Sequence, residues 1–519
     1  MQSTGLTRPI WMQPEVATIR GPIDSDLKAD FCVVGAGIAG LSVAYELCLE
    51  GLDVVVLDGQ SVGSGETGRT SAHLCTALDD RYFELERLFG ASGARSAAES
   101  HGAAIARIEW TVGAESIECE FERVDGFLFV PPEQSVDILN DELAAAQRAG
   151  LDVELIDRAP AGFDTGPCLR FARQGQFHPL RYLTGLASAA KRRAVRIFGG
   201  AHVVSTESGS PCRATTKDGH AVQAQSLVVA TNTPINDRVM MHTKQAAYRT
   251  YVIAARVARN VVGKALYWDT ADPYHYVRIY RPHNGTANQD ILIIGGADHK
   301  SGQASNVAQR YECLIQWARE RFPIETIEYA WSGHIIEPVD ALAFIGRNPG
   351  ERNVYIASGD SGNGLTHGTI AGVLIKDLIL GRDNSWAALY DPARKSIRAA
   401  REFAGETLNM AGQYADWLTS GDIVDAADIP PGEGAIMRDG ATKVAVYRDS
   451  VGELHVRSAV CRHLGCIVRW NPGEKSWDCP CHGSRFDCRG QVLNGPAVMG
   501  LDAVPREASR FEWGPKTAR

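Results

Sequence analysis

Continuous apolar runs in the first part of the chain predict buried parallel strands. The runs at 31–34 and 54–57 flank a glycine-rich turn and a helical stretch that ends near Glu50. Runs of the same character follow at 227–230, 251–254, 291–294 and 354–357. Strands that are apolar on both faces are typical of a parallel sheet covered by helices. We therefore expect an α/β fold for most of the chain.

The pattern changes after Gly421. Short alternating runs are separated there by frequent Gly, Asp and Asn residues and by Pro430-Pro431-Gly432, as in a small all-β domain. Before this boundary, helical periodicity is expected over Ser92–Glu118, Asp137–Gly150, Gly368–Leu380 and Arg394–Leu418. The expected domains are 1–385, a helical connector at 386–421, and the β domain at 422–519.

The composition, net charge and apolar runs of the chain exclude several classes of protein. The 519 residues are 45% apolar and 22% charged, which is an ordinary globular composition, and the length suits roughly three folding units of about 150 residues. The net charge of −9, without a long basic run, argues against nucleic acid as a partner. No uninterrupted apolar run reaches about 18 residues, so no transmembrane segment is expected. Without a targeting signal the expected location is cytoplasmic, where cysteines stay reduced.

The first glycine-rich turn has the form of a dinucleotide site. It reads Gly35-Ala36-Gly37-Ile38-Ala39-Gly40 and stands between a strand and a helix. The three glycines permit a tight turn, close approach of a pyrophosphate and close packing of helix on strand. Asp58 ends the next strand, where a carboxylate binds ribose hydroxyls. A second G-x-G-x-x-G at 63–68 lacks this strand-helix context and is expected to be a loop.

Five of the twelve cysteines fall between Cys461 and Cys488. Within this cluster, Cys461 and His463 are followed after fifteen residues by Cys479 and His482. Each half supplies one thiolate and one imidazole, as a Rieske cluster requires, because one iron takes both cysteines and the other takes both histidines. Zinc sites usually pair Cys with Cys and His with His, so zinc is the weaker alternative.

The chain up to about residue 385 resembles the D-amino-acid-oxidase-like family, the glycine oxidase and sarcosine oxidase group. The match lies in the first glycine-rich turn with Asp58 and in the segments 65–71, 228–232 and 359–366. The resemblance implies bound FAD, with FAD-binding parts at about 28–90, 170–235 and 335–385. A mixed-sheet α+β substrate domain would occupy about 95–165 and 236–334. Further FAD-binding residues implied are Gly65, Thr67, Arg69, Thr70, Ser71, Val204, Ala230, Thr231, Gly362, Asn363, Gly364, Leu365 and Thr366.

The region from about 422 resembles a Rieske [2Fe–2S] domain. Cys466 and Cys481 occupy the positions that form a disulfide in cytochrome-complex Rieske proteins, so a bridge between them is expected. Ser484 resembles the residue whose hydroxyl donates to a cluster sulfide. The family's nearby tyrosine donor is Phe486 here. The segment 494–496 resembles the proline loop that covers the cluster.

Members of the flavoprotein family oxidise C–N bonds by transferring hydride to the flavin, whose reactivity the protein directs. Candidate catalytic residues are Tyr251, Tyr276, Arg278, His299 and His334. The carboxylate-binding arginine of the family's W-x-G-x-R-P segment is replaced by Ile335, which argues against a simple amino-acid substrate unless Arg249 or Arg278 takes its place. A covalent flavin link through His73 stays open.

Together these features predict an FAD-dependent amine or amino-acid-derivative dehydrogenase. It would take hydride from a small amine-type substrate and relay single electrons through the cluster to an external protein or quinone-like acceptor. The alternatives are an oxygen-using amine oxidase with an accessory cluster and a redox sensor or electron carrier with a non-catalytic flavin. A Rieske oxygenase is disfavoured because no separate site of two histidines and one carboxylate is apparent.

Overall fold

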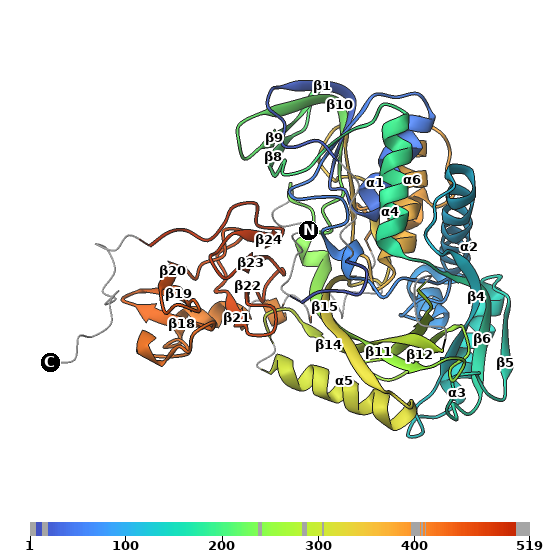
Figure 1. The fold of residues 1–519 in the computed structure, drawn as a ribbon. Coiled ribbons are helices and arrows are strands. Elements are labelled where there is room, and N and C mark those ends of the chain that lie inside the picture. Colours follow the sequence, from blue (N-terminus) through green and yellow to red (C-terminus); the bar gives the residue numbers. More distant parts are fainter. Residues whose placement is uncertain are drawn as a thin grey trace.

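The computed structural model describes residues 7–12, 19–236, 241–282, 288–303, 306–395, 405, 408–410 and 412–504. Figure 1 shows a helix-covered sheet at the top, a second large sheet below it, and the small C-terminal domain on one side. The fold class expected from the sequence is confirmed: an α/β part with a mostly parallel sheet and a second, mixed sheet, followed by an all-β region. None of the helices among the described residues is long and apolar enough to cross a membrane.

The first sheet carries the dinucleotide motif. Its strand order is β16 (Phe344–Arg347), β17 (Val354–Ser358), β10 (Ala221–Val229), β1 (Leu27–Val34), β2 (Val54–Leu57) and β7 (Arg196–Phe198), with β8 (Val203–Glu207) and β9 (Cys212–Thr216) attached to β10. The pairs from β17 to β7 are parallel. Helices α1 (Ile38–Leu49), α4 (Pro179–Arg192) and α6 (Gly364–Ile379) pack together beside it (Figure 1). The carboxyl ends of these strands share one edge, where such folds bind ligands.

The second sheet has nine strands and is mostly antiparallel. Its order is β15 (Thr326–Pro338), β11 (Gln245–Ala258), β14 (Gln289–Lys300), β13 (Tyr276–Tyr280), β12 (Leu266–Asp269), β4 (Glu122–Phe129), β6 (Cys168–Gln176) and β3 (His73–Leu74), with β5 (Val153–Ile156) beside β6. Helix α5 (Val307–Arg321) packs on β11 and β14. One face of the sheet therefore forms a core with α5, and the other is left to face the first sheet and its ligand.

The helices differ from expectation mainly at their ends. Helix α2 (Tyr82–Glu115) starts ten residues before Ser92 and continues across a kink at Gly90, where φ is +74°. Helix α3 (Asp137–Arg148) matches its predicted range closely, and α6 starts at Gly364. Of the expected helix over Arg394–Leu418, residues 396–404, 406, 407 and 411 lie outside the described ranges, and 405, 408–410, 412 and 413 are helical. Its described end is the 3-10 turn η4 (Tyr414–Leu418), preceded in the connector by α7 (Ala387–Tyr390).

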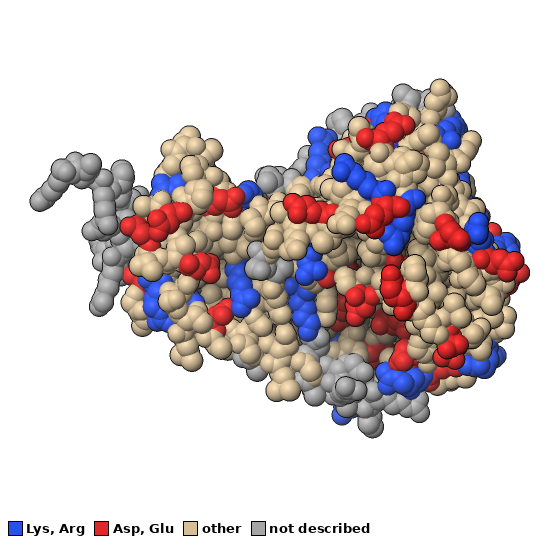
Figure 2. Space-filling view, turned by 90° about the horizontal axis from the view of Figure 1, so that it is seen from below, with Lys and Arg blue, Asp and Glu red and all other residues tan. Residues whose placement is uncertain are grey.

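The C-terminal domain consists of two small sheets. One contains β18 (Gly434–Asp439), β19 (Thr442–Arg448) and β20 (Leu454–Ser458), and the other β21 (Arg469–Asn471), β22 (Ser476–Asp478), β23 (Arg485–Asp487) and β24 (Val492–Asn494). The first Cys-His pair lies between β20 and β21, and the second lies between β22 and β23. On the face shown in Figure 2, the described basic side chains are interspersed with acidic ones.

A buried carboxylate joins this domain to the rest of the chain. Glu474 lies in the turn between β21 and β22, and its Oε1 is 2.9 Å from Arg69 Nη2 and 3.3 Å from Arg249 Nη2. Its side chain also accepts hydrogen bonds from the hydroxyl of Ser332 and from the backbone N–H of Thr7. All three charged side chains are almost fully buried. The two arginines lower the pKa of Glu474 to about 2 despite its burial.

We expect Glu474→Gln to weaken the packing of the C-terminal domain against the rest of the chain. Removing one partner of a buried ion pair leaves the others charged and unmatched, which costs about 3–5 kcal/mol. Chemical denaturation at pH 7 should show this loss of unfolding free energy, whereas Glu453→Gln, an exposed glutamate of the same domain, should change it by less than about 0.5 kcal/mol. Equal stabilities of the two variants would contradict the role given to Glu474.

The stabilities of wild type and Glu474→Gln should respond differently to acid. A carboxylate whose folded pKa is depressed contributes stability that is complete above its unfolded pKa of about 4.3 and is lost as pH falls toward its folded value. For Glu474 that folded value is about 2. The stability difference between wild type and Glu474→Gln should therefore shrink as pH falls from about 4.3 toward 2. A difference that stays constant over this range would show that the charge of Glu474 is not its cause.

Candidate functional site

A cavity of about 530 Å³ lies where the two large sheets and the C-terminal domain meet. Asp58 and His202 line one end of it, and Trp268, Tyr274 and Tyr276 line the other. The first glycine-rich turn forms part of the wall between these ends. The cavity is thus lined by a carboxylate and a glycine-rich turn as well as by aromatic rings, which suits a dinucleotide that carries a reactive ring.

The glycines of the turn leave room that side chains would fill. Gly35 has φ +108°, and a Cβ there would stand 2.4 Å from the carbonyl oxygen of Ala230. A Cβ on Gly40 would stand 1.9 Å from the carbonyl oxygen of Gly35, so the helix can pack closely only with glycine at this position. Gly37 faces the cavity, where a Cβ would approach Thr67 Oγ1 to 3.2 Å. The turn therefore has the close backbone approach that a pyrophosphate needs.

Asp58 is fixed by the backbone on both sides. Its two carboxylate oxygens accept the N–H of Ala36 at 2.7 Å and of Gln60 at 2.8 Å. Burial raises the pKa of this carboxyl group, and the two N–H donors act against that rise. The carboxylate faces the cavity at the end of β2, in the place where it would bind the ribose hydroxyls of a dinucleotide.

Most of the residues expected to bind FAD line the cavity. They are Gly35, Gly37, Ile38, Ala39, Asp58, Gly65, Thr67, Arg69, Thr70, Ser71, Ala230, Thr231, Gly362, Asn363, Gly364 and Leu365. Helices α1 and α6 both start at this wall, so their N-terminal N–H groups face a site for an anionic cofactor. Gly63–Gly68 forms a loop with the 3-10 turn η1 (Glu66–Arg69), as expected. The residues present fit FAD.

Four of the expected FAD-binding residues do not line the cavity. Ala36 and Gly40 support the turn from within, and the Thr366 hydroxyl donates to the carbonyl oxygen of Asn363 at 3.0 Å inside α6. Val204 is a correction: its neighbour Val203 lines the cavity instead. Successive side chains of a strand point to opposite faces, and Val204 lies on the face of β8 directed away.

The other end of the cavity has aromatic walls and buried carboxyl groups. The Tyr276 hydroxyl is 2.7 Å from Thr250 Oγ1, and the Tyr274 hydroxyl donates to Asp79 Oδ2 at 2.7 Å. Burial raises the pKa of Asp79. His73 also lines this end, and burial together with the charge of Arg278 lowers its pKa to about 3, which keeps the imidazole neutral.

Three of the five candidate catalytic residues lie away from the cavity. Tyr251 follows Thr250 on β11 and points into the core with α5, where its hydroxyl is 3.2 Å from His299 Nε2. Arg278 is buried and donates to the carbonyl oxygen of Ala72 at 2.7 Å. Tyr251, His299 and Arg278 are therefore structural groups in this fold, and the strand alternation explains the error for Tyr251.

His334, in contrast, lies between the cavity and the C-terminal domain. It lines the cavity, and its backbone N–H donates to Glu66 Oε2 at 2.7 Å. Neither ring nitrogen has a hydrogen-bond partner among the described residues, and burial lowers the pKa of the imidazole to about 4. A Cβ on Gly483 would stand 2.7 Å from His334 Nε2, so this ring is in contact with the second Cys-His loop.

The two Cys-His loops bring the two cysteines together and the two histidines together. Cys461 and Cys479 belong to the same buried cluster, and each thiol shifts the pKa of the other. The rings of His463 and His482 lie next to each other, with centroids 4.9 Å apart. Two adjacent thiols and two adjacent imidazoles, one of each from each loop, are the donor set of a Rieske [2Fe–2S] cluster. The residues present fit that cluster, and these four side chains would hold it.

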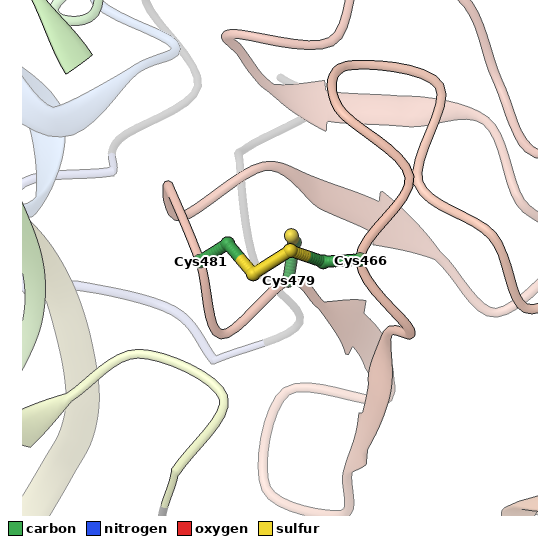
Figure 3. Close-up of side chains that lie close together, drawn as sticks. All are labelled: Cys466, Cys479 and Cys481. Atoms are coloured by element: carbon green, nitrogen blue, oxygen red, sulfur yellow. A yellow bond between two sulfur atoms is a disulfide. The ribbon is translucent and has the colours of Figure 1, made fainter. Parts of the chain in front are cut away.

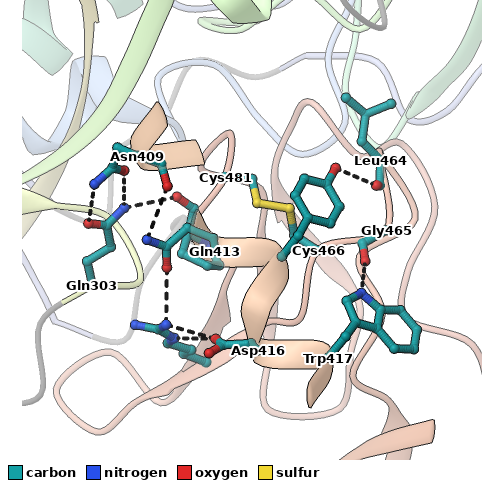
Figure 4. The surroundings of a disulfide bond; sticks show 12 residues. Gln303, Asn409, Gln413, Asp416, Trp417, Leu464, Gly465, Cys466 and Cys481 are labelled. Atoms are coloured by element: carbon teal, nitrogen blue, oxygen red, sulfur yellow. Dashed lines mark hydrogen bonds and ion pairs between the residues drawn. A yellow bond between two sulfur atoms is a disulfide. The ribbon is translucent and has the colours of Figure 1, made fainter. Parts of the chain in front are cut away.

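The expected disulfide is confirmed. Cys466 and Cys481 are bonded, with Cα atoms 6.4 Å apart, and Cys479 lies beside the bridge (Figure 3). The bond removes both thiols from the set of possible metal ligands and ties the two loops together. The connector holds the same region, because Tyr414 donates to the carbonyl oxygen of Leu464 and Trp417 to that of Gly465 (Figure 4).

Several important residues could not be found from the sequence. Asp79, Trp268 and Thr250 line the substrate end of the cavity but stand in no motif. Glu474 lies in an ordinary polar turn, and only the tertiary structure shows that two arginines surround it. Residues 491–495 and 497–500 also line the cavity although they belong to the C-terminal domain, and the one sequence signal there is the resemblance of 494–496 to a proline loop.

Ser484 should set the reduction potential of the cluster. Its hydroxyl oxygen accepts the N–H of Ala497 at 3.0 Å, and the hydroxyl lowers the pKa of the neighbouring Cys461 thiol. Ser484→Ala removes a donor that favours the reduced cluster, so losing about 1.4 kcal/mol of hydrogen bonding should lower a one-electron potential by about 60 mV. Redox titration followed by electron paramagnetic resonance measures this shift, with exposed Ser450→Ala as the control. An unchanged potential would contradict the assignment.

Comparison with known proteins agrees with this geometry. Residues 30–378 match the family model "FAD dependent oxidoreductase" (DAO), and residues 420–505 match "Rieske [2Fe-2S] domain". The putative Rieske 2Fe-2S iron-sulfur protein YhfW of Bacillus subtilis is 30% identical over 488 residues, covering 93% of this chain and 94% of YhfW. Gamma-glutamylputrescine oxidoreductase of Escherichia coli is 25% identical over 372 residues, covering 69% and 85% of the two chains.

A solved structure supports the fold of the larger part. Glycine oxidase from Geobacillus kaustophilus superposes with a TM-score of 0.60 at 17% identity, covering 71% of this chain and 99% of the oxidase. The two family matches are separated by residues 379–419. The chain therefore belongs to the DAO family of FAD-dependent oxidoreductases and carries a C-terminal Rieske [2Fe–2S] domain.

Proposed function

We propose that the protein is an amine dehydrogenase whose electrons leave through the Rieske domain to an external one-electron acceptor. The substrate would lose a hydride and a proton at a C–N bond and become an imine. FAD supplies two-electron chemistry when bound, and the cluster supplies one-electron chemistry. The two electrons would then leave one at a time, to a protein or quinone-like acceptor.

The observation that carries this proposal is the contact between the cavity and the second ligand loop. His334 lines the cavity and touches Gly483, which follows the ligand His482. On the same side, the ring of His242 packs against those of His463 and His482 at centroid distances of 4.6 and 5.7 Å. The histidine side of the cluster site therefore faces residues of the part that matches the FAD-dependent oxidoreductase family, which supports transfer between the two.

The lining of the cavity favours an amine without an α-carboxylate. Arg249 is held by Glu474, and Arg278 is held by backbone carbonyl groups, so neither replaces the family arginine lost at Ile335. Arg69 lines the cavity, but Glu474 and the carbonyl oxygen of Ser332 bind its guanidinium. Asp79 and Asp360 also line the cavity. A substrate carboxylate would meet these acidic groups without a bidentate partner.

An anaerobic screen tests the function. Each amine and, in a separate reaction, its α-carboxylated analogue is mixed with the holoenzyme. Flavin absorbance and the cluster's electron paramagnetic resonance signal are followed in both reactions. We expect at least one amine to bleach the flavin and to reduce the cluster, and its carboxylated analogue to react more slowly. Flavin bleaching with no cluster signal would indicate an oxidase with an accessory cluster. No bleaching by any amine would indicate a sensor or carrier, and either result would refute the proposal.

His334 should matter more for cluster reduction than for flavin reduction. We expect His334→Ala to remove the packing contact with Gly483 and to slow cluster reduction severalfold, with a smaller change in the rate of flavin bleaching. Anaerobic stopped-flow absorbance resolves the two phases. The control is His455→Ala, in β20 and outside the cavity lining. The relay would be contradicted if His334→Ala left the ratio of the two rates unchanged.

A further inference from the structure

The Rieske domain forms part of the FAD cavity itself. Every residue of the segment 491–500 except Pro496 lines this cavity. The segment begins in β24 and continues through the proline loop, and we call it the wall segment. A cofactor bound in the cavity would therefore contact residues from both halves of the chain.

Direct contacts join the wall segment to Glu66, His202 and Ile235, which also line the cavity. Asn494 Nδ2 donates to Glu66 Oε1 at 3.0 Å, beside the η1 turn. The carbonyl oxygen of Val498 is 2.8 Å from His202 Nε2, next to Asp58 at the ribose end. Between these points, a Cβ on Gly495 would lie 3.4 Å from Ile235 Cγ2. The wall segment thus follows the cavity from the middle to its ribose end.

The wall segment is also bound to the second ligand loop of the cluster. Arg485 Nη1 donates to Asn494 Oδ1 at 3.1 Å, and the Ser484 hydroxyl accepts the N–H of Ala497 at 3.0 Å. Arg485 is fully buried and pairs with Asp478 at 3.1 Å. The position of the wall is therefore set by the same loop that carries His482.

We propose that the Rieske domain retains FAD, because the wall segment closes the cavity along the ribose half of the site. FAD binding and the docking of this domain onto the rest of the chain are then thermodynamically linked, so that each favours the other. The inference depends on FAD binding in this cavity and is independent of the proposed amine substrate and of electron relay.

The test measures how fast the holoenzyme releases FAD. After dilution, released FAD is followed by its rise in fluorescence, with full cluster occupancy checked by its electron paramagnetic resonance signal. Asn494→Ala removes two hydrogen bonds of the wall segment, so release should be about tenfold faster than in wild type. Met499→Ala trims a wall side chain that is 41% exposed and carries little of the fold. It should also speed release, by a smaller factor.

The matched control is Val451→Ala, which trims an apolar side chain of the same domain that is 85% exposed and lies outside the cavity lining. Its release rate should equal that of wild type. Release rates of Asn494→Ala and Met499→Ala that both equal the control, with the cluster intact, would overturn the proposal. Failure of every amine to bleach the flavin would leave this result unaffected, so the two proposals can fail separately.

Discussion

The buried ion pairs of Glu474 with Arg69 and Arg249 are the constraint on which the arrangement of the two domains depends. Charged groups removed from water are tolerated only when they are closely paired. Glu474 belongs to the Rieske domain, while the arginines belong to the FAD-binding part and the large mixed sheet. Separating the domains would break both of these ion pairs. The pairing therefore favours one relative position, and that position brings the Cys-His loops to the edge of the FAD cavity.

Sequence reasoning succeeded where chemistry depends on local spacing. The turn with Gly35 and Gly37, Asp58 at the end of β2, and the paired Cys-His loops could be predicted from short motifs whose geometry is set by neighbouring backbone. The Cys466–Cys481 disulfide is instead implied by the resemblance to cytochrome-complex Rieske proteins. The sequence alone did not predict which face of a strand lines the cavity. Tyr251 and Val204 point away from the cavity, although Thr250 and Val203 beside them line it. A shift of one residue in strand register would exchange the side chains that line the cavity for their neighbours. That register is determined only when the sheets pack.

The interface itself left no signature in the sequence. Glu474 stands in a polar turn of the kind found on most protein surfaces, and Arg69 was assigned to the flavin loop alone. Their meeting depends on contacts between residues more than 400 positions apart, such as that of Arg69 with Glu474. The same holds for His334, whose ring touches both the cavity and Gly483. These residues join the two domains through buried contacts that no sequence motif indicates.

The central claim is that electrons pass from the flavin to the cluster within one chain. The most direct test is the rate of cluster reduction after anaerobic mixing with a substrate that bleaches the flavin, measured at several protein concentrations. Transfer within the chain predicts a rate constant that is independent of protein concentration. A rate that rises in proportion to protein concentration would show that electrons pass between molecules, and would contradict the account.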